Sequence, residues 1–505
     1  MPSTTIVSAP GKVLIAGGYL VLDRAFEGLV VATDARFFTM IHKANHKSNT
    51  IRVVSPQFEN STWHYTVNIT PGKTTVEQDS KDSSKNPFVH LALKISLAIL
   101  GHTIPHEQLQ DGLSTGLDIF IAGDNDFYSQ REELQRQSLP LTSDSLRQIR
   151  LFSPTYTTLG QVHKTGLGSS AALMTSLVAA LFSHFGATKI DLIQHPTDLQ
   201  YIHNIAQYIH CFAQGKVGSG FDVSSAVYGS HQYLRFSPSL IEALMTESAL
   251  DHIDKLYQTL DPRQTSWDNF VDRFQLPPQF QMVLADIDAG SHTPSMASKV
   301  LRWRKAKPEE ADGLWAHLGR ANDRVAELMR RLTKMARQHP LEYELAITKA
   351  AGLPASQWES LLNQSIHPTD KTASLLLELH RTFETVRKYL REMSVLADVP
   401  IEPEMQTRLL DACLEANGVL MAGVPGAGGF DAIFCIVLSD ESRQAVEKIW
   451  AGFKEMSVGP LLCSESIEGG LVLEHVGEEG ETAQAQDLSP SVQRLFDLYQ
   501  ESRAN

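Results

Sequence analysis

The sequence contains little cysteine. Only 4 of its 505 residues are cysteines, and Cys211, Cys413, Cys435 and Cys463 form no closely spaced pair. A disulfide framework and a zinc site are therefore not expected, and reduced thiols in an intracellular protein fit better.

Positive charge is also in short supply. The chain has 44 Lys and Arg against 58 Asp and Glu, which gives a formal net charge of −14. It lacks the excess of basic residues that attracts nucleic acids or anionic membranes, so we expect neither as a partner. An anionic substrate would have to be held by a local group of lysines and arginines, against the overall field.

Long apolar runs are missing as well. No stretch of about 18 uncharged apolar residues occurs, and Lys94 interrupts the apolar run from 89 to 100. The opening residues MPSTTIVSAPGK carry neither the charged nor the apolar block of a signal peptide. We therefore expect a cytoplasmic protein, with a monomer as the default oligomeric state.

The chain does contain alternating strand and helix patterns, which predict an α+β protein of two domains. The segment 237–278 carries four prolines and is predicted to be the junction between an N-terminal domain, 1–236, and a C-terminal domain, 279–505. Segments 44–86 and 123–160 are predicted to be a solvated hairpin with loops and an irregular surface excursion. In the first half we expect strands at 6–7, 13–15, 29–32, 117–121 and 232–236, and helices at 87–100 (with Gly101 as C-cap), 171–185 and 198–214 (ending at Gly215). In the second half we expect strands at 281–287, 432–438 and 470–475, and helices at 310–338, 369–397, 403–417 and 440–456.

The most informative segment is His-Lys-Thr-Gly-Leu-Gly-Ser-Ser-Ala-Ala, residues 163–172. Gly166 and Gly168 run into Ser169 and Ser170 and then into an apolar helix pattern. Such a loop presents bare backbone N–H groups at a helix N-terminus, where the helix dipole also favours an anion. A serine there can cap the helix, contact a phosphate or ligate Mg²⁺. An ordinary strand-to-helix turn is the alternative on this segment alone.

Two further glycine-bearing segments stand in order with it: APGKVLIAGGYLVLD at 9–23 and GVPGAGGFDAIFCIVL at 423–438. Together the three resemble the GHMP kinase superfamily. Four details resemble the phosphomevalonate kinases of the eukaryotic type within it. They are Gly17-Gly18-Tyr19, Lys164 directly before Thr165, the segment 214–222 (QGKVGSGFD), and Ile401-Glu402-Pro403 followed by 406–410 (QTRLL).

This resemblance implies two lobes, an N-terminal ribosomal-protein-like α/β domain and a C-terminal ferredoxin-like α+β domain, with the active site in the cleft between them. It also implies transfer of phosphate from ATP to 5-phosphomevalonate, a step of isoprenoid and sterol precursor synthesis. A mevalonate kinase or another kinase of an alcohol, a decarboxylating relative, and a non-catalytic protein that kept the fold remain alternatives.

The resemblance also assigns the nucleotide and metal residues. Lys164, Thr165, Gly166, Leu167, Gly168, Ser169, Ser170 and Ala171 would hold ATP, and Asn86 would border the adenine. Ser169 or Ser170 would ligate Mg²⁺. Mevalonate-kinase-like relatives add a glutamate where this chain has His210 or a neighbour, which leaves the metal with serine, phosphate, water and, in one reading, Asp222.

Lys12 and Asp222 are the catalytic candidates by family position. A solvated lysine and a helix-capping acid are the alternatives. Since the second pKa of a phosphate monoester is about 6, the acceptor is already mostly a dianion at neutral pH and a general base has little to remove. Our hypothesis is that Asp222 orients Lys12 or the metal.

The acceptor residues are predicted from position and charge. Ser291, His292 and Thr293 follow a strand end, and Lys299, Arg302 and Arg304 lie just beyond, where they could clamp a phosphate or form a solvated helix face. Lys216 and Ser219, near Asp222, are further acceptor candidates. Residues 426–429 and Asp431 are predicted to form a turn that closes the cleft.

Overall fold

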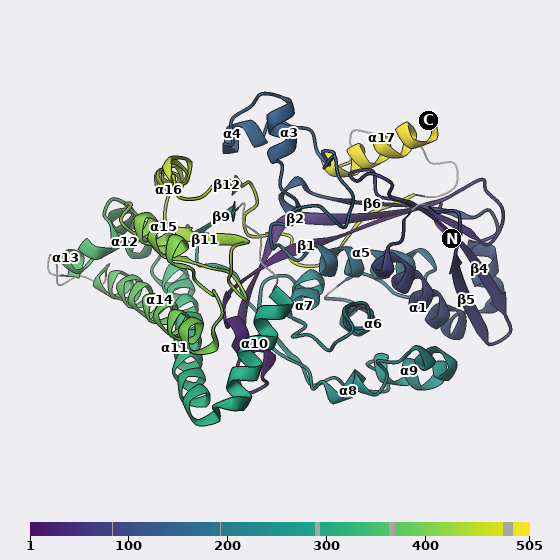
Figure 1. Ribbon diagram of the computed structural model, residues 1–505, viewed down its shortest axis with the longest axis horizontal. Coiled ribbons are helices and arrows are strands. Elements are labelled where there is room, and N and C mark those ends of the chain that lie inside the picture. The colour runs from purple at the N-terminus through teal and green to yellow at the C-terminus, as the bar shows by residue number, and fades with distance from the viewer. Residues whose placement is uncertain (83, 192, 288–292, 363–368, 478–487, 505) are drawn as a thin grey trace.

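Two β-sheets with their helices organise the molecule (Figure 1), and the computed structural model describes all residues except 83, 192, 288–292, 363–368, 478–487 and 505. The large sheet has nine strands and the small sheet four. The two-lobed α+β architecture predicted from the sequence is thereby confirmed.

The large sheet follows the strand order β13-β1-β2-β6-β3-β4-β5, and a short arm adds β7 and β8 next to β2. Its strands are β1 (Thr4–Ala16), β2 (Gly28–Lys43), β3 (Thr50–Val54), β4 (Thr62–Thr70), β5 (Lys73–Gln78), β6 (Leu117–Gly123), β7 (His231–Leu234), β8 (Phe270–Arg273) and β13 (Val472–Gly477). Strand β4 alternates buried and exposed residues, with Trp63, Tyr65 and Val67 facing the core. Residues 44–86 thus supply three strands rather than mainly loops.

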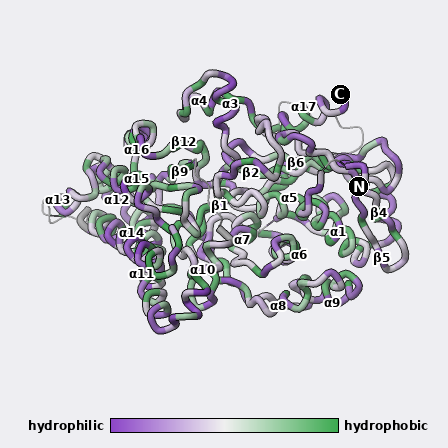
Figure 2. Tube along the Cα trace, viewed as in Figure 1, coloured by the Kyte–Doolittle hydropathy of each residue, from purple (hydrophilic) through white to green (hydrophobic). Residues whose placement is uncertain are grey.

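Helices cover both faces of this sheet (Figure 1). Helices α1 (Pro87–Thr103), α5 (Ser169–His184), α6 (Pro196–Gln214) and α7 (Phe221–Tyr228) lie on one face, and α17 (Pro490–Ala504) lies on the other. Helix α5 is apolar on nearly all sides because it contacts β1, β2, α1 and α6, and Figure 2 shows its mainly hydrophobic course. The smaller helices of this lobe are α2 (His106–Gly112), α3 (Arg131–Arg136), α4 (Ser143–Leu146), α8 (Ser239–Glu242) and α9 (Ile253–Leu260), with 3₁₀ turns η1 (Gly18–Leu22), η2 (Asn125–Phe127) and η3 (Glu247–His252).

The small sheet has the antiparallel order β10-β11-β9-β12. Its strands are β9 (Gln281–Ile287), β10 (Val419–Gly423), β11 (Ala432–Val437) and β12 (Val458–Leu461). With helices between β9 and β10 and α16 (Asp440–Gly452) between β11 and β12, this is the β-α-β-β-α-β arrangement of a ferredoxin-like domain, as expected. The other helices of this lobe are α10 (Thr293–Ala306), α11 (Pro308–Gln338), α12 (Pro340–Ala351), α13 (Glu359–Leu362), α14 (Thr369–Ala397) and α15 (Glu404–Leu414), with the turn η4 (Ala355–Gln357).

Segments near both ends of the chain lie on the large sheet. The lobes of the structure therefore do not coincide with the ranges 1–236 and 279–505 expected from the sequence. Strand β13 pairs with β1, and α17 packs near β6, although both lie in the segment 279–505. The predicted junction 237–278 contributes β8, which pairs with β7 in the large sheet. The segment 123–160 contains only short helices, and Arg131 in α3 donates to the Ser457 carbonyl of the other lobe at 3.2 Å.

Two local predictions were wrong. The two strands expected at 6–7 and 13–15 are one continuous strand, β1, with register shifts between Pro10 and Lys12 and between Leu14 and Ala16. Gly101 does not cap α1, which continues to Thr103. A Cβ at Gly101 would lie 2.2 Å from Thr74 Oγ1, so this glycine allows α1 to pack closely on β5.

Candidate active site

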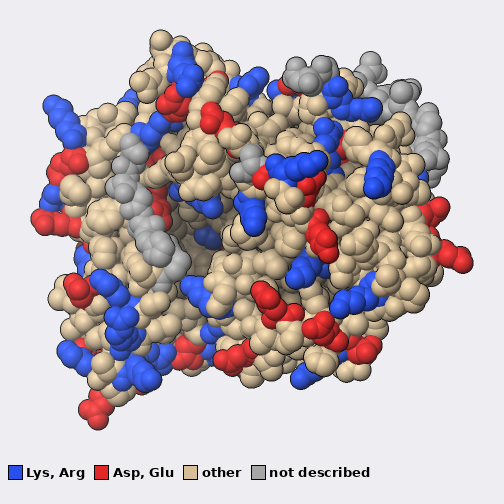
Figure 3. Space-filling model, turned by 45° about the vertical axis from the view of Figure 1, so that its right-hand side comes forward, with Lys and Arg blue, Asp and Glu red and all other residues tan. Residues whose placement is uncertain are grey.

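A cavity of about 740 Å³ lies between the two lobes. Figure 3 shows a hollow near the middle of the molecular face, with lysine and arginine side chains around it. The large-sheet lobe supplies β1, η1, the loop before α5, the end of α6 and the start of α7. The other lobe supplies α10 and the turn before β11. The polar and charged lining residues are Lys12, Tyr19, Lys164, Ser169, Ser170, Gln207, His210, Gln214, Lys216, Ser219, Asp222, Ser298 and Asp431.

The glycine-rich loop opens directly on this cavity. Gly166 and Gly168 have φ values of +81° and +79°, so both need the left-handed backbone that glycine adopts without strain. Gly168 is the N-cap of α5 and has no side chain to occupy the helix tip. The Ala171 N–H already donates to the Gly168 carbonyl at 3.1 Å, so the N–H groups of Ser169 and Ser170 are those that the helix tip presents to an anion. This confirms the loop geometry predicted from the sequence.

Lys12 reaches the same loop from β1. Its backbone N–H donates to the Leu167 carbonyl at 2.9 Å, and its Nζ donates to the Gly166 carbonyl at 2.7 Å. The register of β1 against β2 shifts beside Gly11. Such bulges change the direction of nearby side chains and are common beside active sites. Burial lowers the pKa of Lys12, and the negative charges of Asp222 and Asp431 partly oppose that effect.

Asp222 lies in the first turn of α7, where Gly220 is the left-handed N-cap. Its Oδ1 accepts the Val223 N–H at 3.0 Å, and its Oδ2 lies 3.9 Å from Nδ1 of His210. His210 Nε2 lies 3.1 Å from Ser170 Oγ, so this buried histidine stands between the loop serine and the carboxylate. Burial lowers the pKa of His210, and Asp222 opposes the shift.

The oxygen donors at this point suit a hydrated Mg²⁺. Ser170 and Asp222 line the cavity, and Ser169 does so while sharing a hydrogen bond with the Tyr128 hydroxyl. Within the described residues no three His, Cys, Asp or Glu side chains gather to enclose a metal. Because Mg²⁺ keeps several waters and binds through one or two protein oxygens plus phosphates, this sparse set fits it.

The other predicted nucleotide residues differ in their placement. Lys164 lines the cavity, and the surrounding protein lowers its pKa although its side chain reaches solvent. Thr165 is buried and donates to the Asp126 carbonyl, so it fixes the loop from behind. Asn86 is buried at the N-cap of α1, where its side chain accepts the Val89 N–H at 3.2 Å. It is not among the described residues that line the cavity.

The predicted acceptor residues separate into two groups. Lys216 and Ser219 line the cavity. Lys299 is half-exposed and reaches the Asp398 carbonyl at 3.3 Å, and Arg302 is exposed. Neither Lys299 nor Arg302 is among the described residues that line the cavity. Helix α10 contributes Ala297 and Ser298 to the lining instead.

The remaining acceptor candidates give no support for a phosphate clamp. Arg304 forms ion pairs with Asp23 at 2.7 Å and Asp312 at 2.8 Å, and its guanidinium lies 3.9 Å from the centre of the Trp315 ring. Ser291 and His292 lie outside the described residues. Thr293 begins α10, but its side chain is outside the described part of the chain.

The turn before β11 seals one side of the cavity. Gly426 N–H donates to the Leu14 carbonyl at 3.0 Å, and the Tyr19 hydroxyl donates to the Ala427 carbonyl at 2.7 Å. Gly428 has a φ of +70°, and a Cβ there would lie 2.1 Å from the Ile401 carbonyl oxygen. The structural role predicted for residues 426–429 agrees with these contacts. Asp431 lines the cavity and contributes charge near Lys12.

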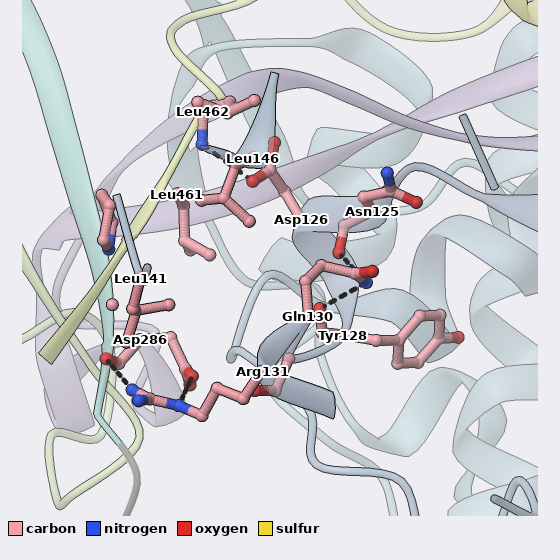
Figure 4. A pocket seen from close by; sticks show the side chains of 13 residues that line it. Asn125, Asp126, Tyr128, Gln130, Arg131, Leu141, Leu146, Asp286, Leu461 and Leu462 are labelled. Carbon is pink, nitrogen blue, oxygen red and sulfur yellow. Dashed lines mark hydrogen bonds and ion pairs between the residues drawn. The ribbon is translucent and has the colours of Figure 1, made fainter. Parts of the chain in front are cut away.

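A second cavity of about 40 Å³ lies between η2, α3 and β12 (Figure 4), with room for water molecules only. On its wall Asp286 of β9 lies 2.8 Å from His163 Nε2 and 3.5 Å from Arg131 Nε. Since His163 directly precedes Lys164, this buried carboxylate joins the small sheet to the base of the loop. The cavity is too small for a substrate.

Comparison with known proteins shows which family the sequence belongs to. The sequence matches the family GHMP kinases N terminal domain over residues 155–230 and the family GHMP kinases C terminal over residues 373–456. It is 38% identical over 490 residues to a peroxisomal phosphomevalonate kinase of Arabidopsis thaliana, covering 92% of this chain and 95% of the relative. It is 35% identical to phosphomevalonate kinase erg8 of Aspergillus fumigatus, covering 90% of each chain. The chain belongs to the phosphomevalonate kinase family.

Solved structures agree on the fold of this GHMP kinase. The Lin0012 protein from Listeria innocua superposes with a TM-score of 0.61 at 15% identity, covering 93% of this chain and 99% of that one. Phosphomevalonate kinase of Streptococcus pneumoniae, in complex with phosphomevalonate and AMPPNP, superposes with a TM-score of 0.56 at 14% identity, covering 91% of this chain and 99% of that one. Among the described residues of this family member, no helix is both long and apolar enough to cross a bilayer.

Proposed function

We propose that this chain transfers the γ-phosphoryl group of ATP to the phosphate of 5-phosphomevalonate, which yields 5-diphosphomevalonate and ADP. An oxygen of the acceptor phosphate forms a bond to the γ-phosphorus, and the bond from that phosphorus to the β–γ bridging oxygen breaks. The observation that carries the proposal is the set of three lysines, Lys12, Lys164 and Lys216, which come from three separate segments to the cavity that the glycine-rich loop opens on. Similarity to phosphomevalonate kinases over most of the chain supports it.

The lysines address the main obstacle of this reaction. Two highly negative groups must approach each other, and positioning with charge neutralisation provides most of the catalysis in phosphoryl transfer. The Lys12 ammonium donates a hydrogen bond to the Gly166 carbonyl beside the helix tip. It therefore lies next to the place where the transferred phosphoryl group would bind. Lys216 lies on the Asp222 side of the cavity and would neutralise the acceptor.

Asp222 orients cations in this proposal rather than removing a proton. Its charge acts on Lys12, and its Oδ2 faces His210 at 3.9 Å. Mg²⁺, when bound, would neutralise charge on the phosphates of ATP, with Ser169 or Ser170 and Asp222 as its protein oxygens. In Asp222→Asn we expect a loss of kcat that is uniform from pH 5.5 to 8.5. A loss confined to pH values below the second pKa of the acceptor, about 6, would identify Asp222 as a general base.

The proposed reaction is tested by ADP formation in a coupled assay with phosphomevalonate, mevalonate and diphosphomevalonate offered separately. We expect turnover with phosphomevalonate alone, with diphosphomevalonate as its product. Turnover with mevalonate would favour an alcohol kinase, release of carbon dioxide would favour a decarboxylating relative, and nucleotide binding without turnover would favour a non-catalytic protein.

We further propose, on the strength of the acidic composition, that the protein has no nucleic-acid or membrane partner, and we keep a monomer as the default oligomeric state. The cytoplasmic location also stays a proposal, because the Arabidopsis relative is named peroxisomal. Sedimentation and fractionation of the cell would test these statements.

A further inference from the structure

Two side chains at the end of β7 hold the wall of the cavity on the Asp222 side: Tyr233 lies in the strand, and Arg235 directly follows it. Tyr233 in β7 donates its hydroxyl to the Ser219 carbonyl at 2.9 Å. Arg235, two residues further along the chain, donates through Nη2 to the Val217 carbonyl at 2.9 Å and the Gly218 carbonyl at 2.7 Å. Three consecutive carbonyls of the segment 216–220 therefore face these two side chains.

Arg235 also holds a second wall segment. Its Nη1 donates to the Leu22 carbonyl at 2.6 Å, and Leu22 ends η1, which lines the cavity from another side. The arginine is only 8% exposed, and no carboxylate among the described residues lies within ion-pair distance of it. Burial lowers the pKa of Arg235, although the nearby charge of Asp23 opposes this. Its guanidinium thus fastens two stretches of backbone together.

The direction of these carbonyls fixes the direction of the neighbouring amides. In a planar trans peptide the C=O of one residue and the N–H of the next point in opposite directions. The bonds from Gly218 and Ser219 toward β7 therefore turn the N–H groups of Ser219 and Gly220 away from β7. Gly218, Ser219 and Gly220 all line the cavity. The Val217 peptide differs, because the Gly218 N–H contacts the Cys211 sulfur.

We propose that Arg235, with Tyr233, is a positioning residue for the phosphorylated acceptor. This inference rests on the proposed function. Arg235 touches neither substrate, and its bonds hold Lys216, Ser219 and the amides before Asp222 in the arrangement that receives the acceptor anion. Nucleotide binding is separate, because the glycine-rich loop at the tip of α5 has no hydrogen bond to Arg235 or Tyr233 among the described residues.

The test uses Arg235→Lys, which keeps the charge but cannot reach three carbonyls, and Tyr233→Phe, which removes one bond. Arg36→Lys is the matched control. Arg36 is a 5% exposed arginine of β2, which pairs with β7, and it donates to the Ser8 and Gly470 carbonyls. It is not among the described lining residues. For each protein we would measure KM for both substrates, kcat, the melting temperature, and hydrogen–deuterium exchange of the segment 216–222.

We expect Arg235→Lys to raise KM for phosphomevalonate about tenfold or more and KM for ATP less than twofold. Amide exchange in 216–222 should be faster, because carbonyls that lose their donor hold the segment less firmly. Tyr233→Phe should raise KM for phosphomevalonate about threefold. Arg36→Lys should lower the melting temperature and leave both KM values within twofold.

An unchanged KM for phosphomevalonate in Arg235→Lys, or equal increases for both substrates, would overturn the inference while leaving the proposed function intact. Absence of ADP formation by the unaltered protein would overturn both. Where Arg235→Lys does not fold, Tyr233→Phe decides: a KM for phosphomevalonate that stays within experimental error rejects the positioning role.

Discussion

The segments 164–171 and 216–222 both bring glycines to the start of a helix in the same cavity, but they are held in different ways. In the first, Gly166 and Gly168 adopt positive φ, and α5 begins at once behind them. In the second, three carbonyls are held by Tyr233 of β7 and by Arg235, which directly follows that strand. The first loop thus has two left-handed glycines, whereas the second has one, Gly220 at φ +87°, and relies more on side chains that are distant in sequence.

This difference matters because the two loops are assigned to different anions. A loop shaped by its own glycines provides a backbone cradle, which suits the invariant phosphates of a nucleotide. A loop held by side chains from elsewhere changes when those side chains change, which suits recognition of a particular acceptor. The predictions below test how far the two loops act independently.

The largest effect is expected at Lys12, which serves both loops. Its Nζ donates to the Gly166 carbonyl, and Asp222 raises its pKa against the effect of burial. Lys12→Met should lower kcat about 10³-fold, equivalent to about 4 kcal/mol of transition-state stabilisation. The measurement is steady-state ADP formation with both substrates saturating. A loss of less than tenfold would remove Lys12 from the chemistry.

A smaller effect, specific to ATP, is expected at Gly168. An alanine there would be strained at φ +79°, and its Cβ would lie 3.0 Å from Lys12 Cε. Gly168→Ala should raise KM for ATP about 30-fold, since the cradle must shift at a cost of about 2 kcal/mol, and it should also lower kcat because the Lys12 side chain must move.

Gly215→Ala is its control, because Gly215 has φ +68° at the end of α6 with no atom within 4 Å of the added Cβ. It should cost stability and leave KM for ATP within twofold. Equal effects of the two substitutions on KM would mean that backbone strain alone, and not the cradle, explains the result.

The role of the second loop is tested by removing its cationic side chain, Lys216. Lys216→Ala should raise KM for phosphomevalonate about tenfold, because a partly enclosed ammonium–phosphate contact is lost, a change of about 1.4 kcal/mol. Lys299→Ala should change it less than twofold, because Lys299 pairs with Asp398 on the exposed surface of α10. Fluorescence or calorimetric titration with phosphomevalonate would measure the affinity of the two variants, and Lys216→Ala should show the larger loss. A larger loss in Lys299→Ala would instead support the phosphate clamp that the sequence predicted at Lys299.

The smallest effect concerns the framework under the second loop. Glu465 accepts from Ser230 Oγ at 3.0 Å, directly before β7, and burial raises its pKa to about 7. Its folded-state pKa therefore lies above the unfolded one, so its contribution to stability is complete below about pH 4 and is lost as the pH rises through 7. Glu465→Gln should raise the melting temperature at pH 8.5 by about 1–2 °C relative to the unaltered protein and change it little at pH 5. Identical pH dependences of melting for the two proteins would refute this.

Elements with a strong local signal could be predicted from the sequence. The strand 281–287 and the helix 369–397 have the predicted bounds, and Gly215 ends α6 in the left-handed conformation. The glycine-rich loop was predictable for the same reason, since its glycines and the following helix are adjacent in sequence. Pro10 was misleading, because a proline and glycine in a strand can mark a bulge as well as a turn.

Features that depend on packing between distant segments could not be predicted. Lys299, Arg302 and Arg304 follow β9 in sequence, but the course of α10 presents Ala297 and Ser298 to the cavity instead. Tyr233 and Arg235 gave one weak signal. The alternation of residues 231 and 233 continues to Arg235, just after the end of β7, and a buried arginine needs partners. Nothing local indicates that those partners are the carbonyls of Leu22, Val217 and Gly218.

The most direct test of the two-loop account is calorimetric titration of Gly168→Ala and Arg235→Lys, each with AMPPNP and with phosphomevalonate. Opposite losses are predicted: Gly168→Ala should bind AMPPNP weakly and phosphomevalonate normally, and Arg235→Lys should show the converse. If both variants lose the same ligand, or each loses both ligands equally, the assignment of one anion to each loop is contradicted.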